Sequence, residues 1–104
     1  MTAGKIASQA GHAYLGAFLE AQKSSPDTAA AYSSDLPGTK VCLQATLSEL
    51  LRAKAEAEAA GLPTFLVVDS GCENFFGGAE TLTALGIACT KRKASKTLRK
   101  LKLL

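Results

Sequence analysis

The chain has 104 residues, 47% of them apolar, which is enough for one small core and too little for two. Its net charge is +3 and charged residues make up 20%, a balance that argues against a disordered chain. No apolar run approaches the roughly 18 residues of a membrane span, and residues 1–20 lack a signal-peptide pattern. We therefore predict a single domain over residues 1–104, located in the cytoplasm and away from membranes.

Two helices are predicted in the first third of the chain. Over residues 3–22, apolar side chains recur at helical spacing, alanine is frequent and proline is absent. Within this helix, Gly11 and Gly16 would let another backbone approach closely. Ser25 and Pro26 suit the N-cap and first position of a second helix, which a Leu-Pro-Gly turn keeps short.

The middle of the chain predicts a brief strand and a third helix. Val, Cys and Leu adjoin within residues 40–44, which favours a strand there. Thr46 and Glu49 have the spacing of a capping box, and the helix that they open should run to about residue 60. The residues expected on its buried side are Leu47, Leu50, Leu51, the stem of Lys54, Ala57 and Ala60.

The last third predicts two further strands and a final helix. Residues 64–68 are a continuous apolar run that ends at Asp69, as in a strand buried on both faces. We predict a Gly-rich loop over residues 70–79, a strand over 81–89 and a basic helix over 91–102. Because helices and strands alternate, we predict the α/β class. The expected architecture is a small mixed sheet of three or four strands flanked by helices, in three αβα layers.

Positive charge is concentrated at the C-terminus. Seven of the twelve basic residues lie within residues 91–102, and no acid lies among them. Such a cluster attracts polyanions such as RNA, but it is also found at solvated helix ends. The sequence leaves both interpretations open. The seven residues are Lys91, Arg92, Lys93, Lys96, Arg99, Lys100 and Lys102.

Several kinds of site are not expected. The three cysteines, Cys42, Cys72 and Cys89, are odd in number and lack C-x-x-C spacing, so we expect free thiols rather than disulfides or a zinc site. With a single histidine and no carboxylate cluster, we expect no metal. The sequence contains neither a phosphate-binding loop motif nor the G-x-S-x-G of serine hydrolases.

A small set of polar residues could converge into a site. Lys5, Gln9 and His12 are spaced i, i+4, i+7, so they share one face of the first helix, away from its apolar stripe. Asp69 ends a buried strand, where ligands gather in open α/β sheets. The alternative is a solvated helix face and an aspartate that caps the following turn.

These same residues carry a resemblance to a known family. Residues 4–13, G-K-I-A-S-Q-A-G-H-A, are similar to the G-K-I-A-A-Q-x-x-H-A motif of type 2 peptidyl-tRNA hydrolases. Further matches follow in the same order and extend the resemblance over nearly the whole chain. Residues 67–71 resemble the family's strand that ends in D-A-G, 83–87 its T-V-L-G-I-G-P, and 100–103 its closing H-L-K-L.

The sequence also departs from the family pattern. Residues 72–74 are Cys-Glu-Asn where the family usually has R-T-Q, and residues 88–89 are Ala-Cys in place of Gly-Pro. The loop is slightly longer, so Thr81 and Thr83 both compete for the family's functional threonine. The family begins with a strand ahead of its first helix, for which this sequence has no room. We therefore expect a chain that begins late, a sheet that is one strand short, or another segment in the place of that strand.

The resemblance implies an enzyme that hydrolyses the ester between a peptide and the 3′ ribose of tRNA, without a cofactor. It implies that Asp69 orients or deprotonates water, that Lys5 supplies positive charge and that Thr83 places the water or the ester. The implied substrate-binding residues are Gln9, His12, Thr81, Lys91 and Arg92. The implied partners are peptidyl-tRNA and a second copy of the chain, and neither DNA nor membrane. The lost R-T-Q and Gly-Pro residues motivate the alternative, a non-catalytic relative that binds tRNA or protein.

Overall fold

The computed structural model describes residues 1–34, 38–69 and 81–104. Five helical segments and two strands follow one another along these ranges. The predicted turn at residues 36–38 lies largely outside them, and the predicted loop at 70–79 lies wholly outside. In chain order the elements are α1 (Ala3–Ser24), α2 (Pro26–Ser34), α3 (Leu47–Ala59), β1 (Thr64–Asp69), β2 (Thr81–Ile87), the 3-10 turn η1 (Lys91–Lys93) and α5 (Lys96–Lys100).

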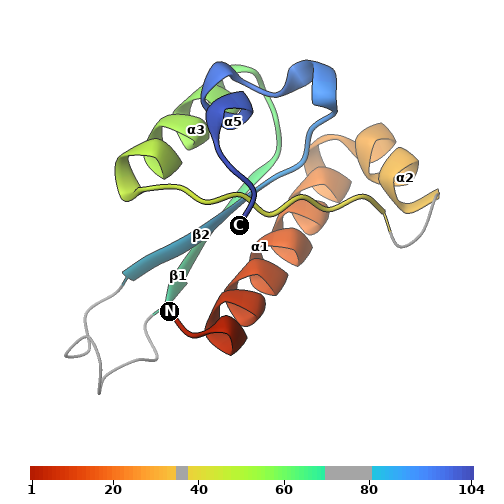
Figure 1. Cartoon of the computed structure of the whole chain (residues 1–104). Helices are drawn as coiled ribbons and strands as arrows, with labels where there is room; N and C mark the ends of the chain where they lie inside the picture. The colour runs from red at the N-terminus through yellow and green to blue at the C-terminus, as the bar shows by residue number, and fades with distance from the viewer. Residues whose placement is uncertain (35–37, 70–80) are drawn as a thin grey trace.

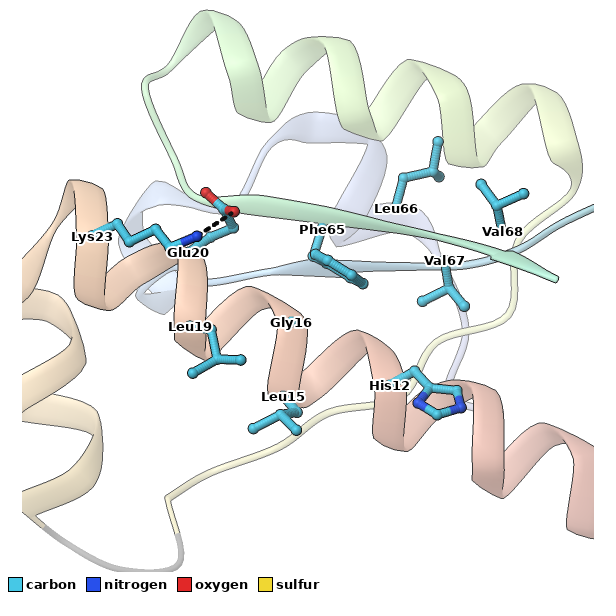
Figure 2. A pocket seen from close by; sticks show the side chains of 10 residues that line it. All are labelled: His12, Leu15, Gly16, Leu19, Glu20, Lys23, Phe65, Leu66, Val67 and Val68. Carbon is cyan, nitrogen blue, oxygen red and sulfur yellow. Dashed lines mark ion pairs between the residues drawn. The ribbon is translucent and has the colours of Figure 1, made fainter. Parts of the chain in front are cut away.

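A small antiparallel sheet of β1 and β2 forms the centre of the molecule, with helices on both sides (Figure 1). Side chains of β1 alternate between the two faces, as a pleated strand requires. Phe65 and Val67 point toward α1, whereas Leu66 and Val68 point toward α3 (Figure 2). The predicted α/β class with flanking helices is confirmed.

The sheet has fewer strands than the sequence suggested. Among the described residues, only two strands pair, and they are antiparallel rather than mixed. The segment 40–44 makes a single bridge, between Leu43 and Leu103. Around it, the Gln44 N–H donates to the Lys102 carbonyl at 2.8 Å and the Leu104 N–H donates to the Cys42 carbonyl at 3.0 Å. These two backbone hydrogen bonds therefore join the segment to the C-terminal residues and not to the sheet.

Helix α1 approaches the sheet very closely. A Cβ atom at Gly16 would overlap the ring of Phe65, and one at Gly86 would overlap the carbonyl oxygen of Ala13. Glycine at both positions is therefore what permits the close contact. At Gly16 the atoms nearest to such a Cβ belong to the Phe65 ring and not to another backbone, and Gly11 has open space around it.

Helix α3 covers the other face less completely. The capping box is present: the Glu49 N–H donates to Thr46 Oγ1 and the Thr46 N–H donates to Glu49 Oε1. However, the buried residues of α3 are Ala53 and Ala57, and the predicted core residue Leu47 is 58% exposed. Leu51 and Ala60 are also exposed, contrary to prediction. Two strands offer too narrow a surface to cover the whole apolar side of this helix.

The C-terminal basic segment is not one continuous helix. Ser95 interrupts it as the N-cap of α5, accepting a hydrogen bond from the Leu98 N–H. Glu56 of α3 holds α5 in place by accepting hydrogen bonds from the Thr97 hydroxyl at 2.8 Å and the Thr97 N–H at 3.4 Å. Polar contacts at the start of α5 therefore join this helix to α3.

Cys42 and Cys89 are free thiols, and Cys72 lies outside the described residues. Burial raises the pKa of the Cys89 thiol above its ordinary value, which lowers its thiolate fraction and its reactivity. Within the ranges that the structure covers, no helix is long and apolar enough to cross a membrane. In the same ranges no three His, Cys, Asp or Glu side chains gather as a metal site.

Candidate active site

An ion pair joins the start of α1 to the end of β1. Lys5 Nζ lies 2.5 Å from Asp69 Oδ2. The aspartate side chain is only 10% exposed and that of the lysine 33%, so the pair is shielded from water mainly on its acidic side. Thr2 sets the start of the helix by accepting a hydrogen bond from the Lys5 N–H at 3.2 Å. Lys5 and Asp69, which are far apart in the sequence, therefore lie together in the fold.

A second polar contact joins α1 to β2 close by. The Thr83 hydroxyl donates to Gln9 Oε1 at 2.5 Å and also lies 3.4 Å from the Val67 carbonyl oxygen. Gln9 is only 7% exposed, so the expectation that it lies on the face away from the apolar stripe is wrong. The sheet crosses α1 on the side of Gln9 and Ala13, and this crossing decides which helix face is buried.

A β-bulge places Thr83. Val67 is opposite Ala84 and Val68 is opposite Leu82, so Thr83 is the extra residue between them. Bulges of this kind bend a strand and redirect one side chain, and they are common beside active sites. Thr81, by contrast, is paired with Asp69 in the regular ladder. Of the two threonines, Thr83 is the one that reaches Gln9.

His12 lies outside this polar group. It is exposed, and it lines a largely apolar groove of about 560 Å³ between α1 and β1 (Figure 2). We call this feature the α1–β1 groove. Its further apolar lining includes Leu15, Leu19, Phe65 and Val68.

Lys91 and Arg92 lie away from the polar group. They follow β2 at the end opposite Thr81 (Figure 1). A strand of seven residues is about 20 Å long, so the start of the basic segment and the Lys5–Asp69 pair lie toward opposite ends of the sheet. Arg92 is exposed, and the side chain of Lys91 lies outside the described residues. Arg92 thus cannot touch the same atoms of a substrate as Lys5.

The polar group has the elements that hydrolysis of an ester requires. A shielded carboxylate can orient a water molecule and accept its proton. An ammonium group beside it can stabilise negative charge on a phosphate or an oxyanion. Because a carboxylate paired with an ammonium is a weaker base than a free one, the arrangement favours positioning of water over strong basicity.

Sequence reasoning missed two features of this region. The burial of Gln9 and the bulge at Thr83 both depend on how α1 crosses the strands, which no local pattern reports. The one available signal was the pair of threonines separated by a single residue, because residues two apart in a regular strand share a face. Only a bulge gives Thr81 and Thr83 different surroundings.

Comparisons with known proteins show the family to which the chain belongs. The family model described as peptidyl-tRNA hydrolase PTH2 matches residues 1–104. A peptidyl-tRNA hydrolase of Methanococcus vannielii is 41% identical over 106 residues, covering 100% of this chain and 89% of the relative. One from Methanococcus maripaludis is 38% identical with the same coverage, and one from Thermococcus onnurineus is 33% identical over 85% of this chain and 75% of the relative. The chain belongs to the peptidyl-tRNA hydrolase PTH2 family.

Proposed function

We propose that this chain hydrolyses the ester bond of peptidyl-tRNA at a centre formed by Lys5, Gln9, Asp69 and Thr83, releasing the peptide and free tRNA. Family membership supports the reaction. The observation that carries the assignment of the site is the Lys5–Asp69 ion pair, which joins residues from two elements distant in sequence. The Thr83–Gln9 hydrogen bond adds a second such contact.

In the proposed reaction, Asp69 holds a water molecule by accepting a hydrogen bond from it. The water oxygen attacks the ester carbonyl carbon, and its proton passes to the carboxylate or through it to the departing ribose oxygen. The bond between that carbon and the 3′ oxygen of the ribose then breaks. Lys5 stabilises the negative charge that forms on the carbonyl oxygen.

Thr83 has a positioning role in this proposal. Its hydroxyl is directed by Gln9, whose burial fixes the amide. A hydroxyl held in this way can turn its lone pairs toward a water molecule or an ester oxygen without a large loss of conformational entropy. Thr81 and His12 remain candidates for contacts with the substrate.

The tRNA part of the substrate is assigned to the basic segment 91–102. Arg92, Lys93, Lys96 and Lys100 are exposed, and the segment begins beyond the end of β2 that is opposite Thr81. Their charges suit phosphates at a distance from the ester, because a nucleic acid is long enough to reach both ends of the molecule. Contacts of this kind position a nucleic acid without reading its sequence, and they weaken steeply with salt.

A homodimer and a cytoplasmic location complete the proposal. Among the described residues, β2 pairs along one edge only, and its unpaired edge invites pairing with a second chain. A substrate that arises during translation is met in the cytoplasm. The size of the particle in solution, measured by light scattering, tests the dimer.

The decisive experiment follows both retention and cleavage of peptidyl-tRNA by the unaltered protein and by Asp69→Asn. We expect cleavage by the unaltered protein and a loss of at least about 100-fold in Asp69→Asn, because the amide cannot accept the proton of water. Binding of the tRNA should persist in the variant. Cleavage that survives the substitution would exclude Asp69 from the reaction, and binding without any cleavage by the unaltered protein would indicate a non-catalytic relative.

A further inference from the structure

We propose that the α1–β1 groove receives the peptide part of the substrate, laid as an extended strand beside β1. This inference rests on the proposed function, because it uses the Lys5–Asp69 pair to fix where the ester lies. It concerns a different part of the molecule, however, and assigns a role to an apolar surface that the hydrolytic centre does not use.

The groove begins at the hydrolytic centre. Val67 belongs to both: its carbonyl oxygen lies 3.4 Å from the Thr83 hydroxyl, and the residue lines the groove. His12, also in the lining, lies less than one helical turn after Gln9 on α1. A peptide whose last carbonyl is held beside Asp69 therefore has the groove immediately next to its preceding residues.

The character of the groove suits a peptide and not the tRNA. Its lining exposes four large apolar side chains to solvent: Leu15 is 59% exposed, Leu19 46%, Phe65 38% and Val68 43%. Apolar residues gathered in one concave surface mark a binding site more often than scattered ones do. A chain of phosphates would gain nothing from these side chains, whereas the side chains of a peptide would remove them from water.

The free edge of β1 offers backbone partners for the same peptide. Among the described residues, β1 pairs only with β2. The groove follows its other edge, because lining residues come from both faces of the strand, Phe65 and Val67 on one and Val68 on the other (Figure 2). An extended peptide added to a sheet edge gains main-chain hydrogen bonds, and pockets for alternate side chains give it specificity.

The direction and length of the bound peptide follow from this placement. β1 runs toward Asp69, so a peptide whose C-terminal ester lies at that residue runs parallel to β1. The lining extends along α1 from His12 to Lys23, about 16 Å at the rise of an α-helix. An extended chain covers that length with about five residues. At the far end Lys23 Nζ lies 3.9 Å from Glu20 Oε1, which closes the apolar surface with charges.

The test compares two substrates that share one tRNA: an N-acetylated single aminoacyl ester, and an ester of an apolar pentapeptide. For the unaltered protein, kcat/KM should be about tenfold higher for the pentapeptide. In Leu19→Glu this ratio should fall to about one, because a buried charge opposes an apolar peptide. The matched control is Leu51→Glu on α3, where the replaced leucine is 44% exposed, close to the 46% of Leu19. It should keep the ratio of the unaltered protein.

The outcomes separate this inference from the proposed function. If both substrates are cleaved equally well by the unaltered protein, the groove is not a peptide site and the hydrolytic centre stands. If neither is cleaved, the proposed function fails. An NMR titration with a blocked pentapeptide of leucine and valine then tests, without any turnover, whether the groove binds a peptide. We expect shifts in the amides of β1 and α1 that Leu19→Glu abolishes, and shifts confined to α3 or absent would overturn the inference.

Discussion

Helices α1 and α3 cover opposite faces of the same two strands, but they are held there by different means. Helix α1 lies so close to the sheet that Gly16 and Gly86 are needed at the contact. Helix α3 buries only small alanine side chains and leaves Leu51 44% exposed. Its contact with the C-terminal helix is made by polar groups around Glu56.

The difference explains where the candidate active site lies. All four of its residues belong to α1 or to the strands that α1 crosses. A closely packed contact fixes side chains within narrow limits, which catalytic groups require. The α3 side adjoins a segment with exposed basic side chains, among them Lys93 and Lys96, and contacts of such side chains suffice to hold a nucleic acid by its phosphates.

We expect the largest effect on stability from a substitution where α1 and β2 lie closest together. Gly86→Ala places a methyl group against the carbonyl oxygen of Ala13, and backbone cannot move aside as a side chain can. We expect the free energy of unfolding to fall by about 3 kcal/mol. Guanidinium unfolding followed by circular dichroism measures it.

Gly11→Ala is the matched control for that prediction. Gly11 is also a glycine and belongs to α1, but nothing lies within 4 Å of a Cβ atom there. Alanine at this helical position should raise the free energy of unfolding by about 0.5–1 kcal/mol. Equal stability of the two variants would show that α1 does not lie as close to β2 as described.

A smaller effect should distinguish the two threonines of β2. Thr83→Val removes the hydroxyl that bonds to Gln9 while keeping the shape of the side chain. We expect kcat/KM for peptidyl-tRNA to fall about 30-fold, within the range for one lost positioning group. Thr81→Val changes the regular ladder position opposite Asp69. It should reduce kcat/KM by about threefold at most, a tenth of the effect of Thr83→Val. If Thr81→Val has the greater effect, the bulge does not mark the functional threonine.

The smallest effect concerns the α3 side. Hydrogen bonds from Ser95 and Thr97 lower the pKa of Glu56 below its ordinary value of 4.5. Since a lowered pKa in the folded state stabilises the protein only while the carboxylate is ionised, this contribution is present above about pH 4.5 and is lost as the pH falls through the lower, folded-state value. Glu56→Gln should therefore unfold at a lower temperature than the unaltered protein near pH 7.

The pH series is the test of that prediction. The difference in melting temperature between the unaltered protein and Glu56→Gln should shrink as the pH falls from about 7 toward about 3. A difference that stays constant over this range would mean that the charge of Glu56 does not hold α5 to α3.

Much of the local structure could be predicted from short sequence signals. Thr46 with Glu49 fixed the start of α3, and Pro26 fixed the start of α2, because capping and proline preferences act within a few residues. The apolar run that ends at Asp69 correctly predicted the end of β1. These features depend on neighbours in the chain, so the chain itself reports them.

What the sequence could not report depends on contacts between distant segments. The burial of Gln9 and the exposure of Leu47 follow from where a narrow sheet meets each helix. The bulge at Thr83 follows from the pairing of β2 with β1. Segment 40–44, predicted as a strand, makes only a single bridge, and its partner in that bridge is the C-terminal Leu103. Within the candidate site, the motif resemblance supplied the residues and the fold supplied their distances.

The most direct test of the central claim compares two lysines of similar exposure. Lys5 and Lys54 are 33% and 29% exposed, and each is paired with an acid, Asp69 and Glu58. If the Lys5–Asp69 pair is the hydrolytic centre, Lys5→Met should lower kcat/KM for peptidyl-tRNA at least about 100-fold, whereas Lys54→Met should change it by less than about twofold. Equal activity of the two variants, at equal melting temperature, would contradict the account.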